Sequence, residues 1–152
     1  MLTFPGVQKL VRAARKRGQT VVTTNGCFDI LHIGHIRYLS EAKRHGDILI
    51  VGVNSDASVR RNKGPKRPVV TQKERAEVIA SLKPVDAAFI FNDETPNKWL
   101  SILKPDVHVK GADRKLTEIV EKDTVIKNGG RVVRARYIDG RSTTNLIKKI
   151  AR

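Results

Sequence analysis

The chain has 152 residues, of which 39% are hydrophobic and 30% are charged. This length fits a single domain with a sizeable core, and no apolar run approaches the ~20 residues that a membrane span requires. The one cysteine, Cys27, excludes an internal disulfide, and the basic N-terminal segment lacks the apolar core of a signal peptide, so we expect a cytoplasmic protein without a membrane partner.

Lysine and arginine number 30 against 15 aspartates and glutamates, which gives a formal charge of +15. Such an excess raises the possibility of a basic RNA-binding protein without catalysis. The basic residues are dispersed, however, and only four Phe, two Tyr and one Trp are present to stack on bases. The charge therefore indicates anion handling in general, and we do not expect a nucleic-acid partner.

Helix-like and strand-like segments alternate along the chain without an internal repeat. The alternation predicts a single α/β domain over 1–152, a Rossmann-like doubly wound fold with a mainly parallel five-stranded sheet flanked by helices. The nearly continuous apolar run 48–53 is typical of a strand covered on both faces. We expect an N-terminal helix over 1–18, a sheet core over 19–141 with strands 20–24, 48–54, 87–91, 107–110 and, at an edge, 131–137, and a C-terminal helix over 142–152.

Two histidines follow the first predicted strand, at the turn into a helix. Asn25 and Gly26 tolerate the backbone angles of a sharp turn, and Gly34 lets the main chain approach a ligand closely. A helix that opens at the carboxyl end of a parallel strand offers unpaired N–H groups to an anion, and His32 and His35 would share one face of its first turn. These residues predict a phosphate site suited to nucleotidyl transfer, followed by a helix that ends at Gly46.

Two other interpretations of the histidines stay open. His32 and His35 could cap the helix or bind carbonyl groups of the core. A zinc site is the second alternative, with Cys27, His32 and His35 completed by His45 or His108. Structural zinc sites usually have paired ligands at short spacing, and the single cysteine disfavours this interpretation.

Turn formers and positive charge are concentrated in segment 63–68, between the second strand and the next helix. This segment is a candidate mobile flap, or a solvated loop without a partner. Thr71 and Glu74 have the spacing of a capping box, so we expect Glu74 to be structural. Arg75 would lie in the first turns of that helix and could face either solvent or phosphate.

Hydroxyl groups precede the last predicted helix, after Gly140. Hydroxyls at such a position usually cap the helix, and they can also bind phosphate together with main-chain donors. The start of this helix and that of the helix at the histidine turn would converge at the carboxyl edge of the sheet, which strengthens the phosphate interpretation. The residues concerned are Ser142, Thr143 and Thr144.

The motif that runs from Gly26-Cys27-Phe28-Asp29 to His32-Ile33-Gly34-His35 resembles the signature of the cytidylyltransferase-like nucleotidyltransferases, over nearly the whole chain. Segments 25–29, 54–56, 109–111 and 139–145 are most similar to the adenylyltransferases of ADP-heptose synthesis. Glycerol-3-phosphate cytidylyltransferases have arginine and threonine where this chain has Tyr137 and Ile138, and threonine in place of Cys27. These departures favour ATP over CTP.

The resemblance implies transfer of AMP from ATP to a sugar 1-phosphate, D-glycero-β-D-manno-heptose 1-phosphate, by an enzyme that forms a homodimer and uses Mg²⁺ with ATP. The alternatives within the superfamily are a cytidylyltransferase for glycerol 3-phosphate or another polyol phosphate, and an FAD-forming adenylyltransferase. Asp29 is expected to brace the turn rather than to perform chemistry. The implied catalytic residues are His32, His35 and Lys63, and the implied nucleotide-binding residues are Cys27, Phe28, Gly34, Arg75, Gly111, Asp113, Ser142, Thr143 and Thr144, with metal ligands unassigned.

Overall fold

The computed structural model describes residues 1–111, 119–135 and 143–150. Within these residues one five-stranded sheet is present, and each neighbouring pair of strands is parallel. The predicted parallel sheet is therefore confirmed, with its expected edge strand. The strands are β1 (Val21–Gly26), β2 (Ile48–Asn54), β3 (Ala87–Phe91), β4 (Val107–Gly111) and β5 (Arg131–Ala135), in the spatial order β3-β2-β1-β4-β5.

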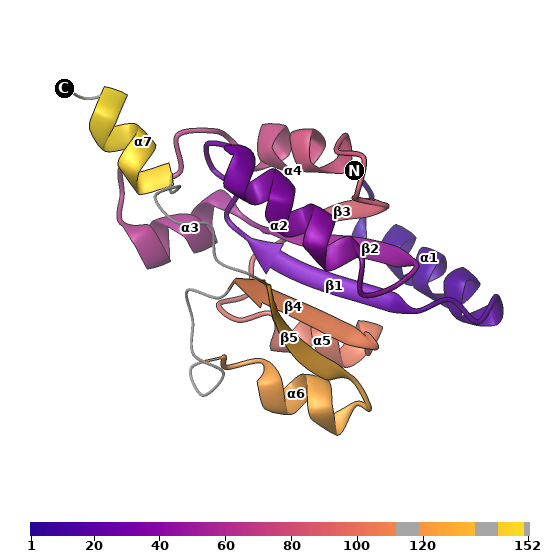
Figure 1. Cartoon of the computed structure of the whole chain (residues 1–152). Coiled ribbons are helices and arrows are strands. Elements are labelled where there is room, and N and C mark those ends of the chain that lie inside the picture. Colours follow the sequence, from indigo (N-terminus) through magenta and orange to yellow (C-terminus); the bar gives the residue numbers. More distant parts are fainter. Residues whose placement is uncertain (112–118, 136–142, 151–152) are drawn as a thin grey trace.

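Helices cover both faces of the sheet, as a doubly wound fold requires (Figure 1). On one face, Leu39 and Ile79 pack into a core with residues of the strands, and on the other face Val11 and Leu100 do the same. The helices are α1 (Phe4–Lys16), α2 (Ile33–Lys43), α3 (Asp56–Lys63), α4 (Gln72–Ala80), α5 (Asn97–Leu103), α6 (Lys122–Lys127) and α7 (Thr143–Ile150).

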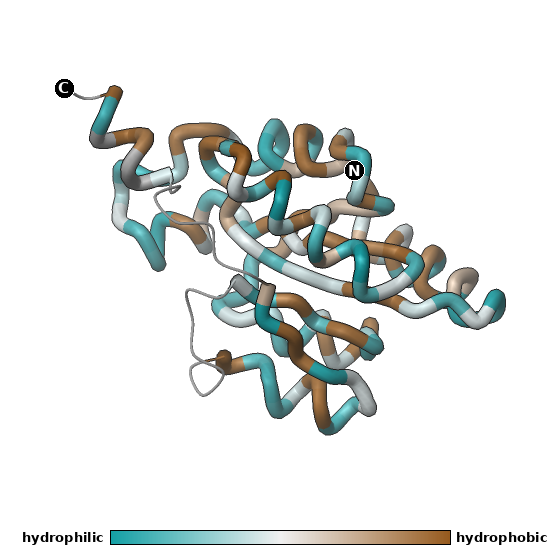
Figure 2. The backbone as a smooth tube through the Cα atoms, viewed as in Figure 1, coloured by the Kyte–Doolittle hydropathy of each residue, from teal (hydrophilic) through white to brown (hydrophobic). Residues whose placement is uncertain are grey.

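The strands supply apolar side chains to both cores because successive residues of a strand point to opposite faces. Val21 packs into the core with α1 and α5, and Val22 packs into the core with α2 and α4. Every residue of β2 is buried, which explains its continuous apolar sequence. Figure 2 shows hydrophobic residues along the strands and an alternation of hydrophobic and hydrophilic residues along the helices.

Gly46 and Gly26 have structural roles that differ from those predicted, a helix C-cap and a turn residue. α2 ends at Lys43 with Arg44 as its C-cap, so Gly46 is not the cap. Gly46 instead allows close packing, because a Cβ there would lie 2.7 Å from Val22 Cγ2. β1 continues through Gly26, and the left-handed residue of the following turn is Phe28, with φ 48°. A Cβ on Gly26 would lie 3.0 Å from the Phe28 ring, so this glycine makes room for the ring.

Three aspartates bind the strands at the amino edge of the sheet. Asp47 Oδ2 accepts from Thr20 N at 2.7 Å, just before β1 begins. Asp106 Oδ2 accepts from Val21 N at 2.7 Å. Asp86 Oδ2 accepts from Leu49 N at 2.6 Å. These carboxylates satisfy main-chain donors that would otherwise remain without a partner at the starts of β1 and β2.

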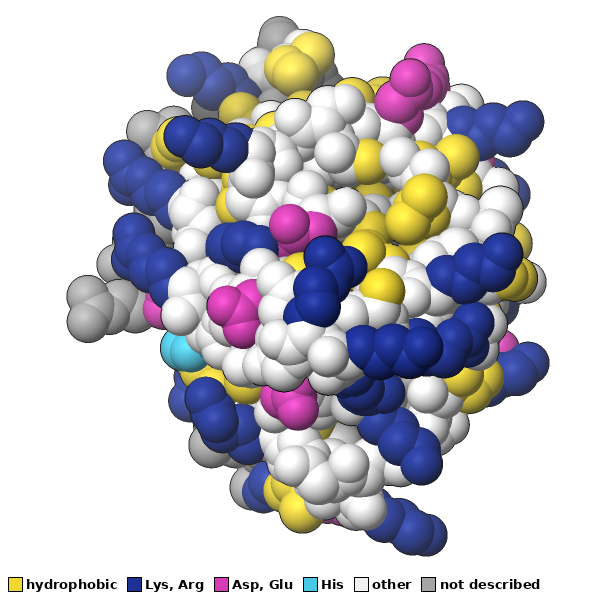
Figure 3. Space-filling model, turned by 90° about the vertical axis from the view of Figure 1, so that its right-hand side faces the viewer, with side chains coloured by type: hydrophobic (Ala, Val, Ile, Leu, Met, Phe, Trp, Pro, Cys, Tyr) yellow, Lys and Arg dark blue, Asp and Glu magenta, His cyan; other side chains and the backbone are white. Residues whose placement is uncertain are grey.

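On the face that Figure 3 shows, the basic side chains are spread out. Figure 3 shows the face at the C-terminal end of α1, where Lys and Arg are scattered among acidic, apolar and neutral groups. They do not form a single stripe on this face, which agrees with the dispersed charge of the sequence. In the described part of the chain, no helix combines the length and apolar character needed to cross a membrane.

Candidate functional site

The two histidines stack on each other at the carboxyl end of β1. His32 is the N-cap of α2, and His35 lies in the first turn of that helix. The two ring centroids are 3.9 Å apart with an interplanar angle of 27°. Phe28 contacts His35 edge to face, with centroids 5.5 Å apart. The prediction that the histidines share one face of the first turn is therefore confirmed.

The His35 ring is neutral at neutral pH. Burial, and then the nearby charges of His32 and Lys63, lower the pKa of His35 to about 4. His35 Nδ1 accepts a hydrogen bond from His32 N at 3.4 Å, which assigns the proton of the neutral ring to Nε2. His35 can therefore offer an N–H donor without carrying a charge. The effect on this pKa shows that the charge of the predicted Lys63 acts on His35.

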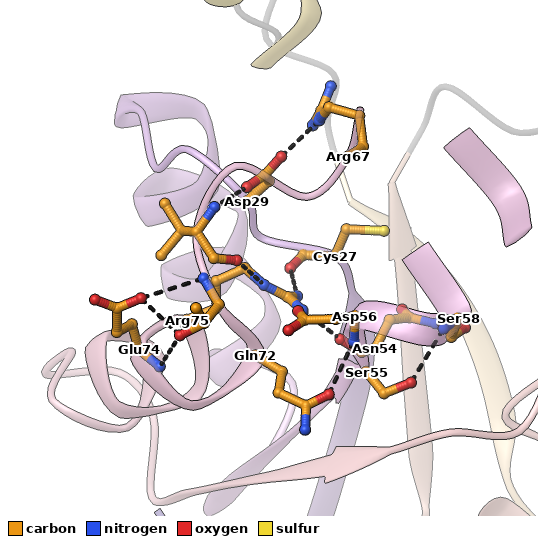
Figure 4. A network of polar contacts seen from close by, with 12 residues as sticks. Cys27, Asp29, Asn54, Ser55, Asp56, Ser58, Arg67, Gln72, Glu74 and Arg75 are labelled. Atoms are coloured by element: carbon orange, nitrogen blue, oxygen red, sulfur yellow. Dashed lines mark hydrogen bonds and ion pairs between the residues drawn. The ribbon is translucent and has the colours of Figure 1, made fainter. Parts of the chain in front are cut away.

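Asp29 holds the segment after Lys63 against the histidine turn (Figure 4). Its Oδ1 accepts from Val69 N at 2.8 Å and from Val70 N at 2.9 Å. Its Oδ2 accepts from Arg67 Nε at 2.6 Å. Burial alone would raise the pKa of Asp29, but these hydrogen bonds outweigh burial and lower it. Asp29 thus braces the turn, as expected.

Arg75 lies inside the protein and does not face solvent, which was one of the two orientations expected for its side chain. It is 2% exposed. Its Nη1 donates to the Cys27 carbonyl, and its Nη2 donates to Asn54 O at 2.8 Å and to Asp56 Oδ1 at 2.7 Å. Its Nε donates to Val70 O at 2.9 Å. The guanidinium therefore supports the strand ends from beneath, and a direct contact between Arg75 and nucleotide stays a prediction.

The start of α4 has the predicted local structure. Thr71 is the N-cap, and its side chain accepts from Glu74 N while the Glu74 carboxylate accepts from Thr71 N. The capping box is confirmed, and Glu74 is structural. The box begins the helix that presents Arg75 to the carbonyl groups at the ends of β1 and β2.

The last helix begins at the histidine turn. Thr143 Oγ1 donates to Ile30 O at 3.1 Å. The predicted convergence of the starts of α2 and α7 is therefore confirmed at this contact, and Figure 1 shows α7 on the side toward which the strands point. Ser142 and Asp113 lie outside the described residues, and for Thr144 only the main chain is described.

A buried polar network lies beneath the end of β4, next to the predicted Gly111. Lys110 Nζ donates to Glu121 Oε1 at 2.6 Å and to Asn25 Oδ1 at 3.1 Å. Glu121 also contacts His108 Nε2 at 3.3 Å, and His108 Nδ1 is 2.8 Å from Thr23 Oγ1. Burial alone would raise the pKa of Glu121, but its contacts with His108 and Lys110 lower it to about 2. The network ties the ends of β1 and β4 to Glu121, and sequence analysis did not identify it.

The described residues contain no group of three His, Cys, Asp or Glu side chains that could hold a metal ion. His108 is fully buried in its network, apart from the histidine turn. What the turn offers is a set of donors: the stacked histidines, Lys63 nearby and the start of α7. Such a set has the chemistry that suits an anion with several oxygens, and the carboxylate of Asp29 is already committed to three donors.

Residues 23–149 match the family model described as Cytidylyltransferase-like. The chain is 50% identical over 147 residues to the bifunctional protein HldE of Geobacter metallireducens, and 48% identical over 144 residues to that of Syntrophotalea carbinolica. These matches cover 97% and 95% of this chain but only 30% and 29% of the two relatives.

A solved structure gives the same result at the level of the fold. The crystal structure of the lipopolysaccharide core biosynthesis protein from Thermoplasma volcanium matches with a TM-score of 0.67 and 36% sequence identity. The match covers 80% of this chain and 98% of that one. The chain therefore belongs to the cytidylyltransferase-like family and is a nucleotidyltransferase.

Proposed function

We propose that this chain transfers AMP from ATP to D-glycero-β-D-manno-heptose 1-phosphate, giving ADP-heptose and pyrophosphate. The observation that carries the proposal is the stacked pair His32 and His35 at the start of α2, with the Lys63 charge nearby and α7 beginning at the same turn. The motifs shared with adenylyltransferases of ADP-heptose synthesis supply the choice of sugar. The HldE relatives and the lipopolysaccharide core biosynthesis protein agree with this choice in their names.

The proposed reaction is an in-line displacement at the α-phosphorus of ATP. An oxygen of the sugar phosphate forms a bond to that phosphorus, and the bond to the β-phosphate oxygen breaks as pyrophosphate leaves. The attacking phosphate is already anionic near neutral pH, because its second pKa is ~6, so no general base is needed. The nearby Asp29 carboxylate is not placed to act as such a base, because hydrogen bonds occupy both of its oxygens and lower its pKa.

The protein would contribute position and electrostatic stabilisation. His35 in its neutral form would donate from Nε2 to a phosphate oxygen, and Lys63 would oppose the negative charge that builds up on the leaving pyrophosphate. Thr143 and the first main-chain N–H groups of α7 would contact a second group of phosphate oxygens. Mg²⁺ enters bound to ATP, as part of the substrate.

A panel of nucleotides and acceptors tests the proposal. Pyrophosphate release is measured with ATP or CTP and with heptose 1-phosphate, glycerol 3-phosphate, another polyol phosphate or FMN. We expect ATP with heptose 1-phosphate to give the highest kcat/KM. Higher kcat/KM with CTP and a polyol phosphate, or with ATP and FMN, would replace this function with the corresponding alternative. Steeply salt-dependent RNA binding without turnover of any pair would favour a non-catalytic RNA-binding protein.

The quaternary structure needs its own measurement. We expect a homodimer, by resemblance to the family, and light scattering at several protein concentrations measures the mass directly. A mass equal to that of one chain at all concentrations would remove the homodimer from the proposal.

A further inference from the structure

The guanidinium of Arg67, beside the histidine turn, has one N–H donor group without a partner among the described residues. The Arg67 side chain is 13% exposed, and its Nε donates to Asp29 Oδ2 at 2.6 Å. Its Nη2 is buried and has no hydrogen-bond partner among the described residues. Leaving a buried charged donor without an acceptor costs free energy, so an acceptor of matching chemistry would bind there favourably.

Arg67 Nη2 lacks a partner because the two oxygens of Asp29 accept from different donors. An arginine and a carboxylate often pair through two parallel hydrogen bonds, with one donor on each oxygen. Here Asp29 Oδ1 already accepts from Val69 N and Val70 N, so Arg67 has only Oδ2. Asp29 therefore fixes the direction of the guanidinium through Nε and leaves Nη2 for another acceptor. In Figure 4 the free end of Arg67 points away from Asp29.

Arg75 provides an internal comparison from the same region. Its Nε, Nη1 and Nη2 all donate to protein oxygens, three of them main-chain carbonyls. Arg75 thus has the contacts of an arginine that holds the fold together. Among the described residues, the Arg67 side chain has one hydrogen bond to protein and one buried donor without a partner, which is the pattern expected of an arginine that binds a ligand.

The position of Arg67 identifies the ligand class. Asp29, which holds it, and Ile30, which accepts from Thr143, are adjacent residues of the histidine turn. Lys63 begins the same basic segment, and its charge lowers the pKa of His35. An acceptor at Arg67 Nη2 would therefore lie among cationic and N–H donors, where an oxyanion is favoured over a neutral group. The planar guanidinium matches phosphate oxygens in particular.

We propose that Arg67 is a substrate-binding residue that donates from Nη2 to a phosphate oxygen, either of the triphosphate or of the acceptor phosphate. The assignment rests on the proposed function and deepens it, because it selects substrates that carry an anionic phosphate at this position. The two sources share one chemistry, and kinetics with each substrate varied separately distinguishes them.

The test compares Arg67→Gln with Lys66→Gln. Lys66 is exposed in the same segment, so its variant removes the same charge without removing the buried donor. We expect Arg67→Gln to raise one KM by about tenfold or more, as for the loss of one charge-assisted hydrogen bond, and Lys66→Gln to leave both KM values nearly unchanged. A rise in the KM for ATP assigns Nη2 to the triphosphate, and a rise in the KM for the acceptor assigns it to the acceptor phosphate.

Calorimetric titrations with ATP, pyrophosphate and inorganic phosphate keep this test separate from the proposed function. If no acceptor of the panel is turned over, the proposed function fails, while weaker binding of any of these three anions by Arg67→Gln still supports the phosphate contact. Arg67→Lys, which can keep an ion pair with Asp29, serves if the glutamine variant does not fold. Unchanged KM values, or unchanged affinities for all three anions, in a folded variant would overturn the assignment.

Discussion

The two edges of the sheet use charged side chains in opposite ways. At the amino edge, the carboxylates of Asp47, Asp86 and Asp106 accept from main-chain N–H groups where strands begin. At the carboxyl edge, Arg75 donates to carbonyl groups where β1 and β2 end, and Lys110 donates to the Asn25 side chain. The strand ends at each edge thus meet the charge that their free main-chain groups require. Near the amino edge, Arg15 and Lys43 also donate to main-chain carbonyls outside the strands.

The difference between the edges explains why the donors of the site are available to an anion. The carboxylates near the carboxyl edge are each bound to cationic or N–H donors: Asp29 to Arg67, Asp56 to Arg75, and Glu121 to Lys110. They brace the site instead of repelling an anion from its surface. At the amino edge, the aspartates bind main-chain donors of the strands, and Lys43 pairs with Asp86. The following predictions test this division of roles.

The largest effect is expected from breaking the network beneath β4. Glu121→Ala leaves Lys110 and His108 buried without their carboxylate, and this should lower the free energy of unfolding by about 3–5 kcal/mol. Urea denaturation measures the change. The matched control is Glu77→Ala on the exposed side of α4, which should change stability by less than about 0.5 kcal/mol. Equal stabilities of the two variants would show that the network does not support the carboxyl edge.

His35→Ala should reduce kcat by about a hundredfold or more while the fold remains intact, because it removes a donor expected to act in the transition state. The control is His45→Ala, between α2 and β2 at the amino edge. Its kcat should match that of the unchanged chain, and thermal melts should show that both variants fold. Near-normal turnover by His35→Ala would remove this histidine from the mechanism.

His35 should also contribute to the dependence of stability on pH. Burial and neighbouring charges lower its pKa from 6.5 to about 4, so the unfolded chain binds more protons at this residue between these values. Stability from this histidine is therefore complete above about pH 6.5 and is lost as the pH falls toward about 4. In urea titrations, His35→Gln should lose less stability than the unchanged chain over this range. Parallel pH profiles would mean that His35 titrates normally in the folded protein.

Lys63→Ala should weaken nucleotide binding or turnover by about tenfold, since it removes one cationic donor from the site. Lys83→Ala removes an exposed lysine between α4 and β3 and serves as the control. Steady-state kinetics with ATP varied compares the two. If both variants have the same kcat and KM for ATP, segment 63–68 is a solvated loop without a role in nucleotide binding.

The smallest effect is expected at the amino edge. Asp106→Ala removes the acceptor of Val21 N and should cost about 1 kcal/mol of stability, with kcat and KM unchanged. Denaturant titration and steady-state kinetics on the same preparation measure both quantities. A lower kcat in a variant that remains folded would show that the two edges are not independent.

The sequence predicted those features that depend on neighbouring residues. The strand β2 follows from its apolar run, the capping box of α4 from the spacing of Thr71 and Glu74, and the shared face of His32 and His35 from helical periodicity. Each pattern is local, so it can be recognised without knowing the rest of the fold.

Features that depend on partners from distant segments were not predicted. Arg75 is buried because carbonyl groups at the ends of two strands lie beside it, and one of them, Cys27 O, belongs to a distant segment of the chain. Arg67 was not singled out because its pairing with Asp29 depends on how the segment folds back onto the turn. Glu121 and Lys110 are ordinary charged residues in sequence, and only the fold places them together inside the protein.

Asp29 and Ile30 are neighbours in the chain, yet they hold two segments that arrive from far along it, one through Arg67 and one through Thr143. A displacement of this dipeptide would act on both of these contacts. We therefore expect occupancy of one phosphate position to prepare the other, so that ATP and the acceptor bind with positive cooperativity. Each substrate would then raise the affinity for the other by the same factor.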